Sequence, residues 1–171
     1  MENTNDLKKY FDTTQYATTI VGAQQTVPVA EDKITSLISL LTDPSNKDVK
    51  EEALITLKKE KAADVLLQAI ASPKSLPNRH ILVAACWESE INFSKYLPFF
   101  ILLALDSNYL ISLEAITAIE NMEGPFVEKD VKEAIQKVKT EQKKISSERA
   151  VLLNDLIMTL ESFIAVQSEH T

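Results

Sequence analysis

The chain has 171 residues, of which 45% are hydrophobic and 25% charged, and its formal net charge is −7. This length suits one domain, or one array of small repeated units, that buries its own core. The two glycines, Gly22 and Gly124, are too few and too far apart for a glycine-rich nucleotide-binding loop. Their scarcity also argues against a sheet-rich fold, because hairpin turns use glycine.

The distribution of charge and of apolar residues narrows the class of protein further. Only the segment 127–146 is basic, so the chain has little from which to build a nucleic-acid-binding face. The longest apolar run, residues 96–105, covers ten residues, whereas a bilayer-spanning helix needs about 20. The N-terminus lacks the apolar stretch of a signal peptide. We therefore expect a cytoplasmic protein that does not enter a membrane.

Residues 1–30 differ in composition from the rest and are expected to form a polar N-terminal extension. Within them, four residues have the spacing of one helical stripe: Leu7, Tyr10, Phe11 and Thr14. Two interpretations are open. The extension is either loosely attached, or it contains a short helix that packs over the end of the array that follows.

From residue 31 onward, apolar residues recur with the helical period, and the intervening breaks predict about eight helices. No segment shows the alternation of a strand, so the predicted fold class is all-α. We expect Ser94 to cap the fifth helix and Ser146-Ser147 to cap the eighth. The main breaks are Asp43-Pro44, Ser72-Pro73, residues 106–108 and Gly124-Pro125.

The second and seventh helices each have four apolar positions in the helical pattern, and the seventh helix is highly charged. In the second helix these positions are Val49, Ala53, Leu54 and Leu57. In the seventh helix the narrow apolar stripe is Val131, Ala134, Ile135 and Val138. Favourable pairs of opposite charge four residues apart stabilise the seventh helix.

The second, fourth and sixth helices align with one another. A small residue recurs at Ala53, Ala85 and Ala115, with spacings of 32 and 30 residues. A period near 30 with two helices per unit is typical of an α-solenoid. The alanine allows two helix backbones to approach closely where the helices of a pair cross.

The segment 40–53 resembles a HEAT repeat through Asp43 at the turn, Val49, the basic Lys50 and the central Ala53. The second repeat has Ser72-Pro73 at the turn and Leu82 at the basic position. The third repeat keeps Asp106 and Ala115, with Ser112 at the basic position. The short period is similar to that of HEAT-like repeats of the phycobilisome-lyase type.

The resemblance implies a short α-solenoid of antiparallel helix pairs over residues 31–171, in which the last two helices act as a cap. It also implies a non-catalytic scaffold or adaptor that binds a protein or peptide through the inner face, which the second helices of the pairs form. Acidic residues at equivalent positions on these helices favour a basic partner. The candidate binding residues are Glu52, Trp87, Glu88, Glu90, Glu114 and Glu120.

The residues that carry chemistry in enzymes do not converge in this sequence. His80 and Cys86 are six residues apart on one helix, so they point about 240° apart. Glu88 and Glu90, two apart on the same helix, point about 200° apart and form no carboxylate pair. We expect no catalytic residue, no cofactor, no metal ion and no nucleic acid.

Other interpretations stay open. A nucleic-acid-binding or base-processing HEAT-like protein would bring Lys50, Lys58, Arg79 and Trp87 together in one groove. The short period alone suggests a chromophore-lyase-type accessory protein. Trp87 is either a core residue or an exposed aromatic anchor. The last helix has apolar residues beyond one stripe, which allows a homodimer through Val151, Leu152 and Ile164.

Overall fold

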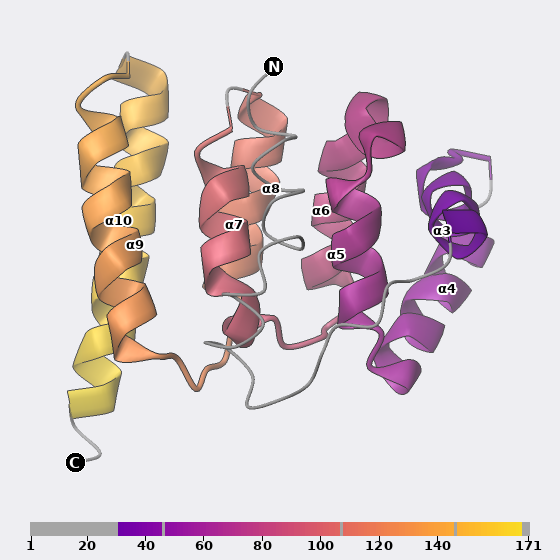
Figure 1. Cartoon of the computed structure of the whole chain (residues 1–171), viewed down its shortest axis with the longest axis horizontal. Helices are drawn as coiled ribbons and strands as arrows, with labels where there is room; N and C mark the ends of the chain where they lie inside the picture. Colours follow the sequence, from indigo (N-terminus) through magenta and orange to yellow (C-terminus); the bar gives the residue numbers. More distant parts are fainter. Residues whose placement is uncertain (1–30, 46, 107, 146, 169–171) are drawn as a thin grey trace. The chain divides into compact units, whose positions relative to one another are not determined.

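The computed structural model describes residues 31–45, 47–106, 108–145 and 147–168. These residues form eight α-helices and two short 3-10 helices, and no β-strand occurs among them. The prediction of an all-α fold is therefore confirmed for this part of the chain (Figure 1). The predictions for residues 1–30 and for Ser146 fall outside the described residues. The chain divides into two compact units after Ile91, and each unit is described by itself.

The first unit is built from four helices that follow the predicted breaks. Helix α3 contacts α4, α5 and α6, and α5 packs against α6. The core of the unit lies between α5 and α6, where Leu66, Leu67, Ile70 and Leu82 are fully buried. The helices are α3 (Glu31–Thr42), α4 (Lys47–Glu60), α5 (Ala63–Ala71) and α6 (Arg79–Glu88), with the 3-10 helix η1 (Pro73–Asn78) before α6.

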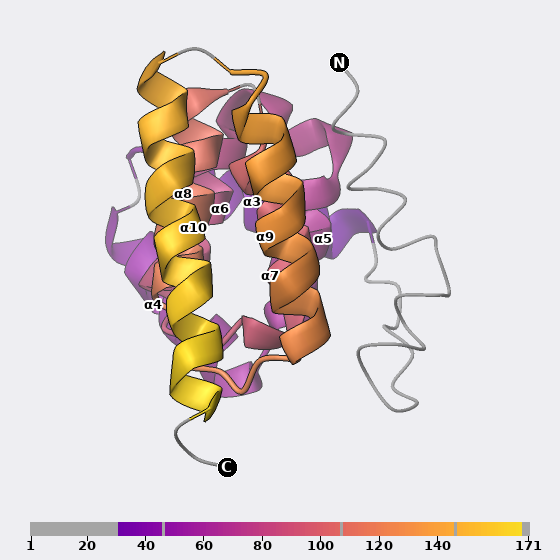
Figure 2. The ribbon, with the colours of Figure 1, turned by 90° about the vertical axis from the view of Figure 1, so that its left-hand side faces the viewer.

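The second unit consists of two helical hairpins that pack on each other. Helix α7 pairs with α8 and α9 pairs with α10, while α7 also contacts α9 and α8 contacts α10. Figure 2 shows α9 and α10 running antiparallel, side by side. The elements are η2 (Ser94–Tyr96), α7 (Leu97–Ala104), α8 (Tyr109–Glu120), α9 (Glu128–Gln142) and α10 (Ser147–Ser168).

The longest apolar run of the sequence forms helix α7 of the second unit. Helix α7 is apolar on all sides, and six of its eight residues are buried, as expected for a helix that neighbours surround. Phe100 contacts Phe99 and Phe93 edge to face, with ring centroids 5.7 and 5.5 Å apart. Within the described ranges, no helix has both the length and the apolar character needed to cross a bilayer.

The turns that end α3, α5 and α7 share one local hydrogen bond. In each turn a side-chain oxygen accepts the backbone N–H two residues later, at 2.9 Å for Asp43, 3.3 Å for Ser72 and 2.8 Å for Asp106. Short polar side chains stabilise turns in this way. These three residues are the ones that the alignment of the three repeats places at the turn of each repeat.

The cap predicted at Ser94 is wrong. Ser94 is already the first residue of η2, and the carboxamide oxygen of Asn92 accepts its backbone N–H at 3.0 Å. The Nδ2 of Asn92 donates to the carbonyl of Gly124 at 2.6 Å, and the Ser94 hydroxyl donates to the same carbonyl at 3.0 Å. Asn92 therefore joins the start of η2 to the loop before α9.

Candidate functional site

Taken in chain order, the α-helices fall into the pairs α3–α4, α5–α6, α7–α8 and α9–α10. Among the described residues, the large apolar side chains that are exposed on α-helices all lie on the second helix of a pair. Helices α3, α5, α7 and α9 carry none. Ile55 is 62% exposed and Met158 is 63% exposed, so both lie largely in solvent. We call the following seven residues the second-helix apolar set: Val49 and Ile55 on α4, Trp87 on α6, Tyr109 and Leu110 on α8, and Val151 and Met158 on α10.

In the first unit, Trp87 is 37% exposed near the C-terminal end of α6, and two ion pairs join the residues that follow it to α4. Lys50 Nζ lies 2.7 Å from Glu88 Oε2, and Lys58 forms an ion pair with Glu90. Each of the two carboxylates is thus neutralised by a lysine. The acidic character predicted for this face is correspondingly reduced.

Glu90 does not lie on α6, because the helix ends at Glu88. Its φ is 52°, in the left-handed region, and its backbone N–H donates to the carbonyl of Trp87 at 3.2 Å. A hydrogen bond from Lys58, and then the lysine charge, lower the pKa of the Glu90 carboxyl from its ordinary value. The helical geometry assumed for Glu88 and Glu90 is therefore wrong for Glu90, and the two carboxylates bind different lysines.

The remaining acidic candidates differ in exposure. Glu52 is exposed on α4, and Glu120 is exposed at the last position of α8. Glu114, in the middle of α8, is half-buried. At the start of α8, the Asn108 side chain accepts the backbone N–H of Leu110 at 3.0 Å. This cap holds the first turn of α8, where two members of the second-helix apolar set lie.

On α10, the exposed apolar residues share one face. Val151 and Met158 are seven residues apart, which is about two helical turns. Of the residues expected in a homodimer contact, Val151 is exposed, whereas Leu152 and Ile164 are half-buried. An ion pair of 2.8 Å between Lys139 and Glu161 ties α9 to α10. One side of α10 is therefore held by α9, whereas the face with Val151 and Met158 is exposed.

The geometry of Cys86 is that of a core residue. The side chain is fully buried, its Sγ donates to the carbonyl of Leu82 at 3.6 Å, and burial raises the pKa of the thiol well above its ordinary value. A buried neutral thiol is a poor nucleophile. His80 is half-buried in the first turn of α6. The described part of the chain contains no group of three or more His, Cys, Asp or Glu residues that could hold a metal ion.

The four residues that would form a basic groove for nucleic acid do not do so. Arg79 is buried, and its Nε donates to the Ser75 hydroxyl at 3.3 Å. Lys50 and Lys58 are engaged with the carboxylates of α6 and its C-terminal turn. The charges of Lys50 and Lys58 are thus compensated within the unit.

Sequence reasoning missed most of the second-helix apolar set, although a signal was present. Ile55 lies outside the apolar positions of its helix, and Met158 lies outside the stripe of α10. A large apolar residue that interrupts the polar side of an amphipathic helix indicates exposure. Val49 is different, because it was expected to be a buried position of α4 but is 42% exposed.

Comparison of the chain with protein-family models, with curated proteins and with solved structures found no match.

Proposed function

We propose that the chain is a short α-solenoid of HEAT-like helix pairs that binds another protein, without catalysis, through its second helices. The observation that carries the proposal is the confinement of exposed large apolar helical side chains, among the described residues, to α4, α6, α8 and α10. Exposed apolar side chains that recur on one helix of each pair make these helices candidates for contact with another protein. The first helices, which carry none, provide the matched comparison within the same molecule.

The packing inside each unit supports a stacked arrangement of pairs. First helices contact first helices in both units, since α3 contacts α5 and α7 contacts α9. Second helices are joined by the α8–α10 contact and by the ion pairs that connect Lys50 and Lys58 of α4 with the end of α6. Lys58 and Glu90 occupy equivalent positions in consecutive repeats, 32 residues apart. Contact between equivalent positions is what stacking of repeats produces.

The three turn residues support the same proposal. Asp43, Ser72 and Asp106 close their turns with the same hydrogen bond, although one of them is a serine. At the position where a HEAT repeat has a basic residue, the first repeat has Lys50 and the third has Ser112, and the two side chains make different contacts. Lys50 pairs with Glu88, whereas the hydroxyl of Ser112 donates to the carbonyl of Ala104. Both side chains tie a second helix to a neighbouring helix.

The chemistry of the proposed partner follows from the exposed side chains. Aromatic residues such as Trp87 and Tyr109 are strong anchors in protein interfaces because they bury a large area at low entropic cost. Exposed carboxylates accompany the apolar residues, with Glu52 on α4 and Glu120 on α8. We propose a partner with apolar anchor pockets that basic side chains surround.

The proposal is tested by affinity capture with the full chain from lysate of its own source cells. We compare the wild type with a triple variant of exposed second-helix residues, Ile55→Ser, Tyr109→Ser and Met158→Ser. The control changes three exposed polar residues of first helices: Asp32→Ser, Lys132→Ser and Gln136→Ser. The control leaves the net charge unchanged, because one acidic and one basic residue are lost.

We expect one protein to be retained by the wild type and by the control, and to be reduced at least about tenfold with the triple variant, because anchor residues dominate binding energy. Equal retention by all three proteins would contradict the role of the second helices. Retention of nucleic acid alone, with release at high salt, would replace the proposal by the nucleic-acid alternative.

A further inference from the structure

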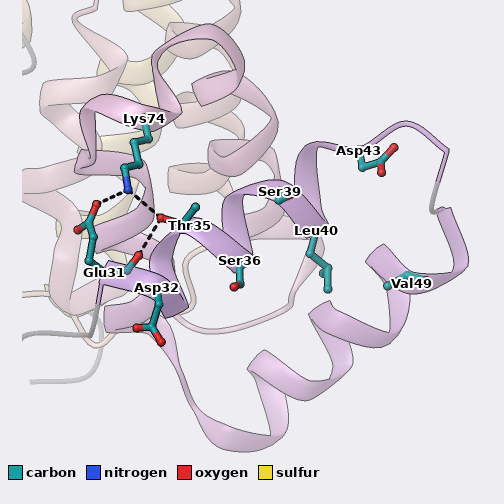
Figure 3. Close-up of a pocket in the computed structure, with 9 residues that line it drawn as sticks. All are labelled: Glu31, Asp32, Thr35, Ser36, Ser39, Leu40, Asp43, Val49 and Lys74. Atoms are coloured by element: carbon teal, nitrogen blue, oxygen red, sulfur yellow. Dashed lines mark hydrogen bonds and ion pairs between the residues drawn. The ribbon is translucent and has the colours of Figure 1, made fainter.

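The first helix pair leaves an apolar groove open between α3 and α4. The groove has a volume of about 420 Å³, and its apolar lining consists of Leu37 and Leu40 of α3, Val49, Ala53 and Leu57 of α4, Ala62 after α4, and Val65 of α5. A second depression of about 810 Å³ shares Leu40 and Val49 with it. Figure 3 shows this depression, with Leu40 pointing from α3 toward α4. We call the first of these two the α3–α4 groove.

Helix α4 is packed less completely than a comparable helix of the same chain. Helices α4 and α9 are both strongly charged, and each has four apolar positions in its sequence pattern. All four of these positions are buried in α9, whereas only Leu57 is buried in α4. Val49, which is exposed, and Ala53, which is half-buried, face the α3–α4 groove instead of a neighbouring helix. An apolar segment that covered the groove would supply the packing that α9 receives from α10.

We propose that the N-terminal residues 7–14 of the same chain occupy the α3–α4 groove as a short amphipathic segment. Leu7, Tyr10 and Phe11 have the spacing of one helical face, which matches the narrow apolar lining of the groove. This inference concerns a contact within the chain and does not depend on the proposed function. It assigns Val49 and Glu52 to that contact and leaves the other six members of the second-helix apolar set for a partner.

The position of the N-terminal segment in the chain favours it over an external occupant. Helix α3, which forms one wall of the groove, begins at Glu31 and directly follows the N-terminal residues. Residues 15–30 are a connection of sixteen residues, which spans up to about 50 Å when extended. A short tether of this kind gives an effective concentration on the order of millimolar, well above that of a free partner.

Charge complementarity also favours this occupant. The α4 wall of the groove carries Glu52 and Glu60, and the α3 wall carries Lys33, so the polar lining is acidic on balance. With helical spacing, Lys8 flanks the apolar residues of the N-terminal segment, whereas Lys9 lies on the opposite side. Lys8 can therefore lie against the acidic wall while the apolar residues enter the groove.

Hydrogen exchange of the full chain tests the proposal. One variant removes the apolar stripe (Leu7→Ser, Tyr10→Ser and Phe11→Ser), and a matched control changes the opposite side of the same segment (Lys9→Ser, Asp12→Ser and Thr13→Ser). We expect the amides of α4 to exchange at least about tenfold faster in the stripe variant than in the wild type or the control. Circular dichroism verifies that both variants keep their helical content. Equal exchange in all three proteins would overturn the proposal.

A cysteine pair identifies the occupant of the groove. Cys86 is fully buried and does not compete. Phe11→Cys combined with Val49→Cys should close an intramolecular disulfide at least about tenfold faster than Thr13→Cys combined with Val49→Cys, because only the first pair faces the groove. Equal rates for the two pairs would overturn docking of the stripe. A covalent dimer in place of the intramolecular product would assign the groove to a second copy of the chain and overturn the proposal.

Discussion

At the scale of single residues, Glu90 combines an unfavourable backbone conformation with a favourable side-chain contact. Its φ of 52° lies in the left-handed region, where the Cβ of any residue other than glycine approaches the following carbonyl oxygen too closely. Glycine is the usual residue at such a position after a helix. The glutamate at this position instead provides the carboxylate that pairs with Lys58 on α4. The ion pair offsets part of the backbone cost and links α4 to the turn that follows α6.

The stability that Glu90 provides is expected to depend on pH. Lys58 lowers the pKa of Glu90 in the folded state, whereas the unfolded chain has the ordinary glutamate value of about 4.3. The contribution is therefore fully present above that value and is lost as the pH falls toward the lower folded-state pKa. We expect the difference in free energy of unfolding between the wild type and Glu90→Gln to be constant near neutral pH and to shrink in acid, as measured by urea denaturation.

A double-mutant comparison isolates this effect. In a Lys58→Met background, the change in free energy of unfolding caused by Glu90→Gln should no longer vary with pH, because the charge that lowers the pKa of Glu90 is absent. High salt should weaken the effect of Glu90→Gln in the wild-type background, since the pair is exposed. An effect that stayed constant into strong acid in the wild-type background would contradict the assigned role of Lys58.

At the scale of helices, residues other than glycine adopt the left-handed backbone conformation that follows some helix ends. Helix α4 ends in a Schellman arrangement, in which Lys61 N–H donates to the Lys58 carbonyl at 3.1 Å and Ala62 N–H donates to the Leu57 carbonyl at 3.0 Å. Lys61, like Glu90, has a φ of 52°. The end of α4 is therefore well hydrogen-bonded but carries backbone strain at Lys61.

We expect Lys61→Gly to stabilise the protein by about 0.5 to 1 kcal/mol, because the relief of left-handed strain exceeds the entropy that glycine adds to the unfolded chain. The matched control is Glu51→Gly, at an exposed position inside α4, which should cost about 1 kcal/mol. Chemical denaturation of both variants measures the difference. A loss of stability in Lys61→Gly would show that the lysine side chain contributes more than its backbone conformation costs.

The sequence predicted the helices well because their ends depend on local chemistry. Proline and the turn residues Asp43, Ser72 and Asp106 act within a few residues of their own position, so helix limits follow directly from them. Asn92 was missed because one of its side-chain hydrogen bonds reaches Gly124, 32 residues away. The pairing of two glutamates at the end of α6 with lysines of α4 was missed for the same reason, since it depends on how one pair of helices lies against another.

At the scale of the whole molecule, buried and exposed apolar residues have separate roles. The stripes of first and second helices fill the interior of each unit, where Leu66 in the first unit and Leu156 in the second are fully buried. The second-helix apolar set remains outside these cores, as Ile55 in the first unit and Met158 in the second illustrate. Apolar residues that add little to packing are available for contact with another molecule.

This separation predicts that exposed and buried apolar residues differ sharply in their effect on stability. Ile55→Ser and Met158→Ser should each change the free energy of unfolding by less than about 0.5 kcal/mol, as most surface substitutions do. Leu66→Ala and Leu156→Ala, one in each unit, should each cost about 2 to 5 kcal/mol, because they leave cavities in a packed core. Urea denaturation of the four variants makes the comparison. A cost above about 2 kcal/mol for Ile55→Ser or Met158→Ser would assign that residue to the core and remove it from the proposed binding surface.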